Sequence, residues 1–511
     1  MITSTRRTVL AGLAGTLAAP HVARAQASPR TSYTLRIDRD VEQLDPAFRS
    51  SPQDGSVIWA VFQKLAKFLP GTTEWRLDAA SDLRQVSDTV VEFTLRPGLM
   101  FSDGYGEMTA EDVKFSFERI GLSSGENLSP YRADWSNLER VEVTGTHTGR
   151  IVMRKPTAHL WRIGILDGSG SIVSRKAIQA MGLGARQKPV GTGPYEMTQF
   201  EPKRQVLLRL RPDWAGPAPV FRDIAIRYVP DPKTAELAYR AGEIDFTELT
   251  PAVANALRTA PETVVAERPG LRFVWISLNT EKKPLDDPRV RRAIRMGLDV
   301  DQMLLAGYQG KAPRARALIQ PAVTGHWPDA PAHKRDVAGA KRLLAEAGVA
   351  PGLRLKLTLL NQPAYQAMAL VARSQLAEIG ITIEVDARDG GSYWSSGKGD
   401  AGKSLDLVIQ RFNGKLDPNF NTQWYRSDQV GVWNWARWAS PEFDALDEQA
   451  AATLDEAARA ALVIRMQQLM EESAAFVWLT YDVDIFAHRS WLKPAIMPTG
   501  SDWQLADFTQ A

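Results

Sequence analysis

Residues 92–120 read "EFTLRPGLMFSDGYGEMTAEDVKFSFERI" and contain the two local patterns that recur along this chain. Apolar side chains at every second position from Val91 to Leu95 predict a half-buried strand, which a Pro-Gly pair ends. Thr109 then stands at an N-cap position, with Asp112 at the capping-box position three residues later. The stretch therefore predicts a strand over 90–98 and a helix that begins after Thr109.

Helix and strand signals of the same kind alternate through the rest of the sequence. Asp287 with Pro288 and Ser440 with Pro441 each pair an N-cap residue with a proline at the first helical position. The strand pattern of 381–385 directly follows a predicted helix. Interleaved helices and strands predict an α/β fold, and 511 residues are too many for one ordinary core, so we expect two or three domains.

The N-terminus has the pattern of an export signal. Arg6 and Arg7 precede a weakly apolar run from Val9 to Ala19, and Ala23-Arg24-Ala25 supplies the small residues that a signal peptidase reads. Paired arginines predict the twin-arginine route, so we expect residues 1–27 to be removed and the protein to be periplasmic. A membrane anchor is the alternative, but the run is about half the roughly 20 apolar residues of a span.

Composition argues against several classes of function. Three of the 62 basic residues lie in the leader, which has no acid, so the remainder balances the 59 acidic residues and gives no support to a nucleic-acid partner. The absence of cysteine excludes thiolate metal sites and cysteine nucleophiles. The histidines are scattered, and the chain lacks an H-E-x-x-H motif, a Walker loop and a G-x-S-x-G elbow. We therefore predict no catalytic residues, no metal site, no cofactor and no enzyme activity.

A second stretch, "LVIQRFNGKLDPNF" at 407–420, has the pattern of a ligand site. A buried strand ends in a cation, an aromatic ring and an amide (Arg411, Phe412 and Asn413), before Asp417 and a proline turn the chain. Arg411 is predicted to hold a carboxylate or other anionic group through its planar fork of donors, and Asn413 to orient a polar group. The alternative is that Arg411 pairs with an acid such as Asp417 and only fixes the loop.

Aromatic residues gather around this stretch. Trp433 and Trp435 are predicted to alternate on one face of a strand. Most tryptophans pack in cores, but aromatic walls with a few placed polar groups also form small-ligand pockets. The predicted ligand contacts are therefore Arg411, Phe412, Asn413, Trp433, Trp435, Trp394, Tyr393 and Phe48, with Arg437 as a weaker second cation.

The order of motifs resembles that of a known family. "LDPAF" (44–48) and the 92–120 block are followed by "PVGTGPYEM" (189–197), "GEIDF" (242–246) and a long block at 277–304. From about residue 33 onward, this order is similar to the family 5 solute-binding proteins of bacterial ABC importers, the dipeptide, oligopeptide and nickel class.

The resemblance implies a periplasmic-binding-protein-like fold of class II, with two lobes joined by a hinge plus an extra domain. Lobe I is expected at 28–55, 185–268 and 481–511, extra domain II at 56–184, and lobe III at 269–480. The resemblance also implies that the lobes close over a small-molecule ligand and that the protein docks on ABC permease subunits in the inner membrane. We expect a monomer.

The same comparison bears on the ligand. The family's peptide binders place Gly-Trp and then an acid at the stretch matching 407–420, and that acid holds the α-ammonium of the peptide. Here Arg411 and Phe412 stand at the Gly-Trp positions, while Asn413, Gly414 and Lys415 cover the place of the acid. A buried ammonium without a counter-charge is costly, which disfavours free peptides.

We therefore expect a small organic solute, peptide-like or carboxylate-bearing. The alternatives are a peptide held differently, a nickel or haem chelate, or an exported sensor or enzyme on the same fold.

Overall fold

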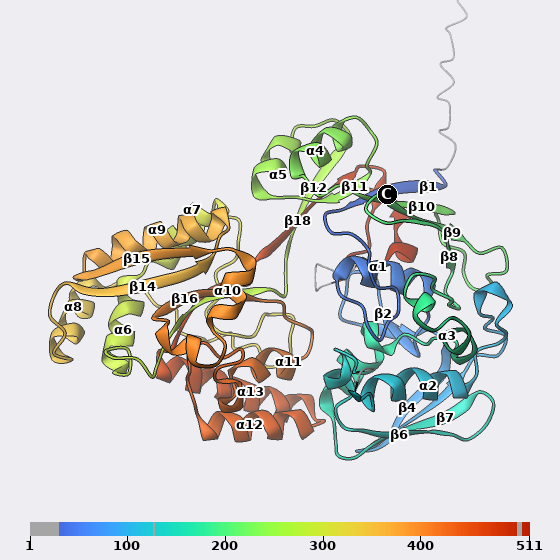
Figure 1. Cartoon of the computed structure of the whole chain (residues 1–511), viewed down its shortest axis with the longest axis horizontal. Coiled ribbons are helices and arrows are strands. Elements are labelled where there is room, and N and C mark those ends of the chain that lie inside the picture. The colour runs from blue at the N-terminus through green and yellow to red at the C-terminus, as the bar shows by residue number, and fades with distance from the viewer. Residues whose placement is uncertain (1–29, 126–127, 498–502) are drawn as a thin grey trace, which may run out of the picture.

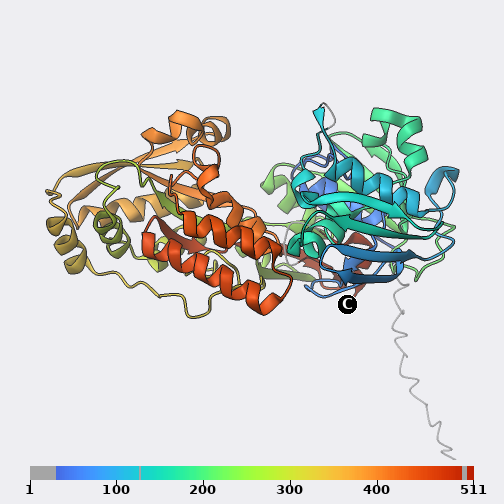
Figure 2. The ribbon, with the colours of Figure 1, turned by 90° about the horizontal axis from the view of Figure 1, so that it is seen from below.

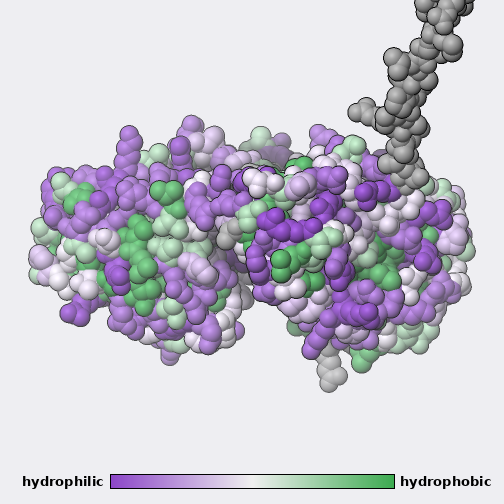
Figure 3. All heavy atoms as spheres, turned by 90° about the horizontal axis from the view of Figure 1, so that it is seen from above, coloured by the Kyte–Doolittle hydropathy of each residue, from purple (hydrophilic) through white to green (hydrophobic). Residues whose placement is uncertain are grey.

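The computed structural model describes residues 30–125, 128–497 and 503–511, so the predicted export signal lies outside the described residues. Two bodies lie side by side, with lobe III on the left of Figure 1 and lobe I with domain II on the right. The outline narrows to a waist between them (Figure 3). The domain boundaries from the sequence are kept as a proposal, and the three names refer to the sheets described below.

The strand and helix predicted around residues 92–120 are confirmed. Strand β5 spans Val90–Leu95, and helix α2 spans Ala110–Gly121 with Thr109 as its N-cap. The Asp112 carboxylate accepts hydrogen bonds from the Thr109 N–H and from the Arg175 N–H, each at 2.9 Å. This side chain therefore fixes the start of α2 and ties it to the start of helix α3.

Domain II is built on an antiparallel sheet with the strand order β4-β5-β7-β6. Helix α2 packs on β6 of this sheet, helix α3 packs on α2, and a short hairpin of β2 and β3 precedes the sheet in sequence. The further bounds are Ala66–Phe68 for β2, Trp75–Leu77 for β3, Ala80–Ser87 for β4, Leu138–Val143 for β6, Thr148–Met153 for β7 and Arg175–Met181 for α3.

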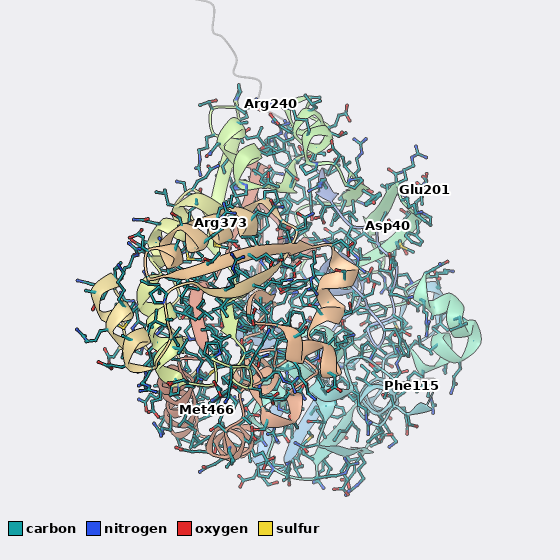
Figure 4. All side chains as sticks on the ribbon, turned by 60° about the vertical axis from the view of Figure 1, so that its left-hand side comes forward. Asp40, Phe115, Glu201, Arg240, Arg373 and Met466 are labelled. Carbon is teal, nitrogen blue, oxygen red and sulfur yellow. The ribbon has the colours of Figure 1, made fainter. Side chains whose placement is uncertain are left out.

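Lobe I is built on a mixed seven-stranded sheet with the order β12-β18-β11-β1-β10-β9-β8. Its strands are β1 Ser32–Ile37, β8 Tyr195–Glu201, β9 Gln205–Leu210, β10 Asp223–Tyr228, β11 Phe246–Glu248, β12 Thr263–Pro269 and β18 Val483–Arg489. Its helices are α1 Pro52–Val61, α4 Pro232–Arg240 and α5 Pro251–Leu257, and a small ribbon joins β19 Leu492–Lys493 to β20 Thr509–Gln510. Asp40 and Glu201 lie close together at one edge of this lobe (Figure 4), because the Asp40 carboxylate accepts a hydrogen bond from the Lys203 N–H at 2.7 Å.

Lobe III is built on a five-stranded sheet with the order β15-β14-β16-β13-β17, covered by helices. The strands are β13 Phe273–Leu278, β14 Leu353–Leu360, β15 Ile381–Arg388, β16 Leu407–Phe412 and β17 Phe476–Thr480. The helices are α6 Pro288–Gly297, α7 Val300–Tyr308, α8 Val337–Glu346, α9 Pro363–Ala377, α10 Gly390–Ser396, α11 Pro418–Thr422, α12 Pro441–Ala452 and α13 Glu456–Ser473. The helix starts predicted at Asp287 and Ser440 and the strand predicted at 381–385 are confirmed.

The chain passes between lobe I and lobe III twice. It leaves lobe I between β12 and β13, and it returns between β17 and β18, so both crossings lie side by side near the centre of Figure 1. Two adjacent crossings of this kind form a hinge about which the lobes can rotate.

Domain II also contacts lobe III. One apolar cluster includes Trp135 and Leu160 of domain II together with Phe443 and Ala450 of α12. Arg162 adds an ion pair with Glu456 of α13, with 3.3 Å between nitrogen and oxygen. Figure 2 shows α12 and α13 on the side of lobe III that faces the other body. The lobes therefore meet both at the hinge and at domain II.

One local prediction is wrong. Residues 431–436 form turns around an isolated bridge and not the strand expected for Trp433 and Trp435. The chain folds back on itself there, because the N–H groups of Val432, Trp433 and Asn434 all donate to the Gln429 carbonyl group. Within the described residues, none of the helices combines the length and apolar character that a membrane crossing requires.

Candidate ligand-binding site between the lobes

A cavity of about 170 Å³ lies between lobe I and lobe III, next to the hinge. Its lining residues are Asp38, Pro52, Gln53, Ser56, Glu248 and Trp503 from lobe I and Arg272, Arg411 and Asn413 from lobe III. Because both lobes contribute, rotation about the hinge changes the shape of this cavity. The structure thus brings together two of the residues predicted from the sequence, Arg411 and Asn413.

Arg411 stands at the end of β16, which the rest of the sheet holds in place. The strand lies between β14 and β13, and Arg411 is directly opposite Val274. The side chain is 32% exposed, and its one ion pair among the described residues joins Nε to Asp482 Oδ2 at 3.7 Å. No described residue accepts a hydrogen bond from its guanidinium group, so the donors of that group are available to a ligand.

Of the acids that could pair with Arg411, Asp417 is not the partner, and the acid that Arg411 pairs with is Asp482, at 3.7 Å. Asp417 instead caps α11, accepting a hydrogen bond from the Asn419 N–H at 2.9 Å, and it forms an ion pair with Arg459 at 2.8 Å. The turn after β16 is therefore held without Arg411.

A buried charge cluster joins the two crossings beside the cavity. Arg272 lies on the first crossing and pairs with Asp482 at 3.2 Å and with Asp484, both of which lie on the second crossing. Glu248 of lobe I is 3.7 Å from the same guanidinium. Burial raises the pKa of Glu248, and it raises the pKa of Asp484 to about 7 despite the nearby Arg272.

Lys415 connects the other end of the stretch to domain II. Its Nζ atom lies 3.0 Å from Asp167 Oδ2 and 3.4 Å from Asp134 Oδ2, and all three side chains are mostly buried. Burial alone would lower the pKa of Lys415, but the two carboxylates outweigh it and raise that pKa. Burial alone would also raise the pKa of Asp167. The positive charges of Lys415 and Arg49 outweigh this effect and hold the pKa of Asp167 below its ordinary value. This contact therefore fastens lobe III to domain II.

Half-buried aromatic rings form a separate cluster on lobe III, beginning at Phe412. Phe412 and Trp433 meet edge to face at 5.8 Å, and Trp394 meets Trp433 in the same way at 6.3 Å. Trp424, which the sequence did not single out as a contact, touches both Phe412 and Trp433. These rings form an aromatic surface next to Arg411, although they do not line the cavity itself.

The structure places the other predicted contacts elsewhere. Tyr393 and Trp435 are each 1% exposed and pack in a small core behind β16, where the Tyr393 hydroxyl donates to the Ile409 carbonyl at 2.7 Å. The Arg437 guanidinium pairs with Glu281. Phe48 lies under the Arg186 guanidinium, 4.5 Å from its ring centre. These four residues are therefore absent from the cavity lining.

Several lining residues could not be identified from the sequence. Arg272, Glu248 and Asp38 belong to segments far apart in the chain, and none of them stands in a recognisable motif. The ion pairs of Arg272 with Asp482 and Asp484 could have been predicted, because these charged residues lie next to the two lobe boundaries expected from the sequence. Within the described residues, no group of three or more histidine, aspartate or glutamate side chains could hold a metal ion.

Comparison with known proteins identifies the class. The family model described as "Bacterial extracellular solute-binding proteins, family 5 Middle" matches residues 75–431, and the chain belongs to this family. The resemblance seen in the sequence is thereby confirmed.

Individual relatives agree with this assignment. The chain is 28% identical over 471 residues to the probable D,D-dipeptide-binding periplasmic protein DdpA of Escherichia coli (strain K12), and the alignment covers 89% of each chain. It is 27% identical over 454 residues to heme-binding protein A of Haemophilus influenzae, which covers 83% of this chain and 82% of the relative. Both relatives are named as binding proteins and the family is one of solute-binding proteins, so the chain is a binding protein and not an enzyme.

A solved structure shows the same fold. The ABC transporter substrate-binding protein CtaP from Listeria monocytogenes superposes with a TM-score of 0.86 at 20% identity, covering 94% of this chain and 99% of the other. The expected periplasmic-binding-protein-like α/β fold is confirmed.

We predict that Lys415→Met loosens the contact between lobe III and domain II. The change removes the cation that Asp134 and Asp167 share, although Asp167 keeps its ion pair with Arg49 at 3.6 Å. Breaking a buried pair costs about 3–5 kcal/mol. The melting temperature should fall, and the distance between spin labels on lobe I and lobe III should increase. Because the chain has no cysteine, introduced cysteines place such labels uniquely.

The matched control is Lys403→Met, which removes an exposed lysine paired with Asp400 at 2.6 Å. Adding Asp134→Asn to the Lys415→Met variant should restore part of the lost stability, because it removes one of the two buried carboxylate charges while Asp167 keeps its ion pair with Arg49 at 3.6 Å. Unchanged distance and melting temperature in Lys415→Met would contradict the role of this contact.

We also predict that Asp484 makes folding stability depend on pH. Its folded pKa of about 7 lies above the ordinary value, so between about pH 4 and 7 the folded state binds a proton that the unfolded chain has released. This stabilising contribution is complete below about pH 4 and is lost as the pH rises through 7. Melting temperatures of Asp484→Asn, minus those of the wild type, should therefore increase from pH 5 to pH 8. The exposed Asp428→Asn serves as control, and parallel pH curves for Asp484→Asn and the wild type would refute the assignment.

Proposed function

We propose that this protein captures a small organic solute bearing a carboxylate in the cavity between lobe I and lobe III, and delivers it to an ABC permease after the lobes close. The available guanidinium group of Arg411 is the observation that carries this proposal. Its neighbour Arg272 already pairs with three carboxylates, whereas Arg411 has one distant ion pair and no hydrogen-bond acceptor among the described residues. A ligand carboxylate would supply the missing acceptor through two parallel N–H···O bonds.

The surroundings of Arg411 favour a ligand with both polar and apolar parts. Asn413 lines the same cavity and supplies an amide that can orient a second polar group. Pro52 and Trp503 of lobe I line the same cavity and offer apolar surface. Lys415, one of the three residues that cover the family's acid position, pairs with Asp134 and Asp167. None of the three residues is a carboxylate that could bind a ligand ammonium.

A peptide-like ligand held differently is the second candidate, and Asp38 is the observation that favours it. Asp38 is exposed and lines the cavity from lobe I, opposite the arginines of lobe III. A zwitterion could place its carboxylate at Arg411 and its ammonium at Asp38. The names of the relatives include binders of a D,D-dipeptide and of haem, so members of this family at such identity differ in ligand.

We predict that Arg411→Ala weakens ligand binding by about 2–5 kcal/mol while leaving the fold intact, because it removes one partner of a desolvated charge pair. A thermal-shift screen of the mature protein against carboxylates, opine-like conjugates, peptides and Ni²⁺ complexes identifies the ligand, since a specific ligand raises the melting temperature. Calorimetric titration of the wild type and the variant then measures the loss.

Arg465→Ala is the matched control, because Arg465 is exposed on α13 and pairs with Glu442 and Glu472. Comparing Arg411→Ala with Asp38→Asn separates the two candidates. A zwitterionic ligand should bind both variants more weakly than the wild type. A simple carboxylate should bind only Arg411→Ala more weakly. Native affinity of Arg411→Ala would remove Arg411 from the site.

We further propose export by the twin-arginine route. The motif of Arg6 and Arg7 before a weakly apolar run supports it, and the relative in Escherichia coli carries "periplasmic" in its name. Replacing both arginines by lysine should stop periplasmic accumulation, measured by cell fractionation and immunoblotting. Full export of that variant, with loss when the Sec route is blocked, would assign the other pathway.

A further inference from the structure

A second and larger cavity lies on the body formed by lobe I and domain II. Its volume is about 740 Å³, within the range of small-molecule sites and more than four times that of the cavity at the hinge. It is lined by the end of α1, the β2–β3 hairpin, and the segments 96–100, 211–220 and 504–509. These elements belong to the right-hand body of Figure 1, so hinge closure is not needed to form this cavity.

Much of the cavity wall is apolar. Trp214 and Pro219 contribute from the 211–220 loop, and Phe62 and Leu99 from the opposite elements. Met100 and Val220, which also line the cavity, are 46% and 44% exposed to water. An apolar concave surface left open to water favours a ligand with an apolar body.

The charges in the cavity favour an anionic ligand. Five basic and three acidic side chains line it, so positive charge is in excess. Lys67 and Arg76 share the single carboxylate of Asp507, each at 3.4 Å. The Arg96 guanidinium is exposed and has no hydrogen bond or ion pair with any residue in 30–125, 128–497 or 503–511.

We propose that this second cavity binds an amphiphilic monoanion, with a carboxylate or sulfonate head beside Arg96 and an apolar body against Trp214. The planar fork of an arginine matches such a head group. The indole ring of Trp214 is half-buried and is held by a hydrogen bond from Nε1 to the Pro217 carbonyl at 3.0 Å, so the wall exists before a ligand arrives. The site is independent of the one assigned to the transported solute.

Titration with decanoate tests the proposal. Val220→Cys provides a unique thiol on the rim, because the chain has no cysteine, and it can carry an environment-sensitive fluorophore. Decanoate should give a saturable blue shift of the emission, and decanol, which has the same chain without the charge, should bind more weakly. The same label at Val86, an exposed residue of β4 outside the cavity, should not respond. Naphthalene-2-carboxylate in place of decanoate tells whether the preferred apolar body is a ring or a chain.

Variants locate the binding. Arg96→Ala should weaken decanoate about fivefold and abolish its advantage over decanol, because an exposed charge contact is lost. Trp214→Ala should weaken decanoate and decanol alike. The exposed Arg354→Ala on β14 of lobe III is the matched control and should behave like the wild type.

Arg411→Ala separates the two cavities, because it should leave decanoate binding unchanged. The absence of a saturable response, an equal affinity in Arg96→Ala, or a loss of decanoate binding in Arg411→Ala would each overturn the proposal. The last of these results would place decanoate in the cavity at the hinge and would leave the proposed transport function standing.

Discussion

The geometry between the lobes depends on one mostly buried guanidinium, that of Arg272. Arg272, on the first crossing, pairs with Asp482 and Asp484 on the second crossing and lies close to Glu248 of lobe I. It therefore connects the two crossings to each other and to lobe I. A charge removed from water needs such partners, and three carboxylates around one arginine repel one another unless one of them holds a proton. These ion pairs therefore hold the hinge in one position, and a further charge near Arg272 would change their strength.

The short stretch from Arg411 to Lys415 connects that hinge with the contact between lobe III and domain II. Arg411 lies 3.7 Å from the hinge carboxylate of Asp482, and Lys415 lies 3.0 Å from Asp167 of domain II. Asn413, between them, lines the cavity. A ligand carboxylate at Arg411 would compete with Asp482 for the same guanidinium. Ligand capture and hinge position would then be coupled through a shared partner, which is how a binding event biases a two-state equilibrium.

The family supplies the architecture, and individual side chains supply the chemistry. A fold match with a TM-score of 0.86 persists at 20% sequence identity, and relatives below 30% identity carry names of different ligands. Such divergence is expected, because lobes and hinge tolerate substitution in their cores as long as size and pattern are kept, whereas a ligand responds to a few polar groups. The positive charge of Lys415 and the available donors of Arg411 are such groups.

The sequence by itself determined the local elements and the family. The strand at Val90–Leu95, the helix capped by Thr109 and the strand ending at Phe412 follow from alternation and capping, which act over a few residues. The tertiary structure alone decided which side chains share the cavity: it placed Arg411 beside Arg272 and Glu248, and it placed Trp435 in a core behind β16. The first outcome depends on contacts between Arg411 and segments more than a hundred residues earlier in the chain, and the second depends on which face of a turn is buried. Neither property is encoded in local periodicity, because periodicity predicts a face and not its partner.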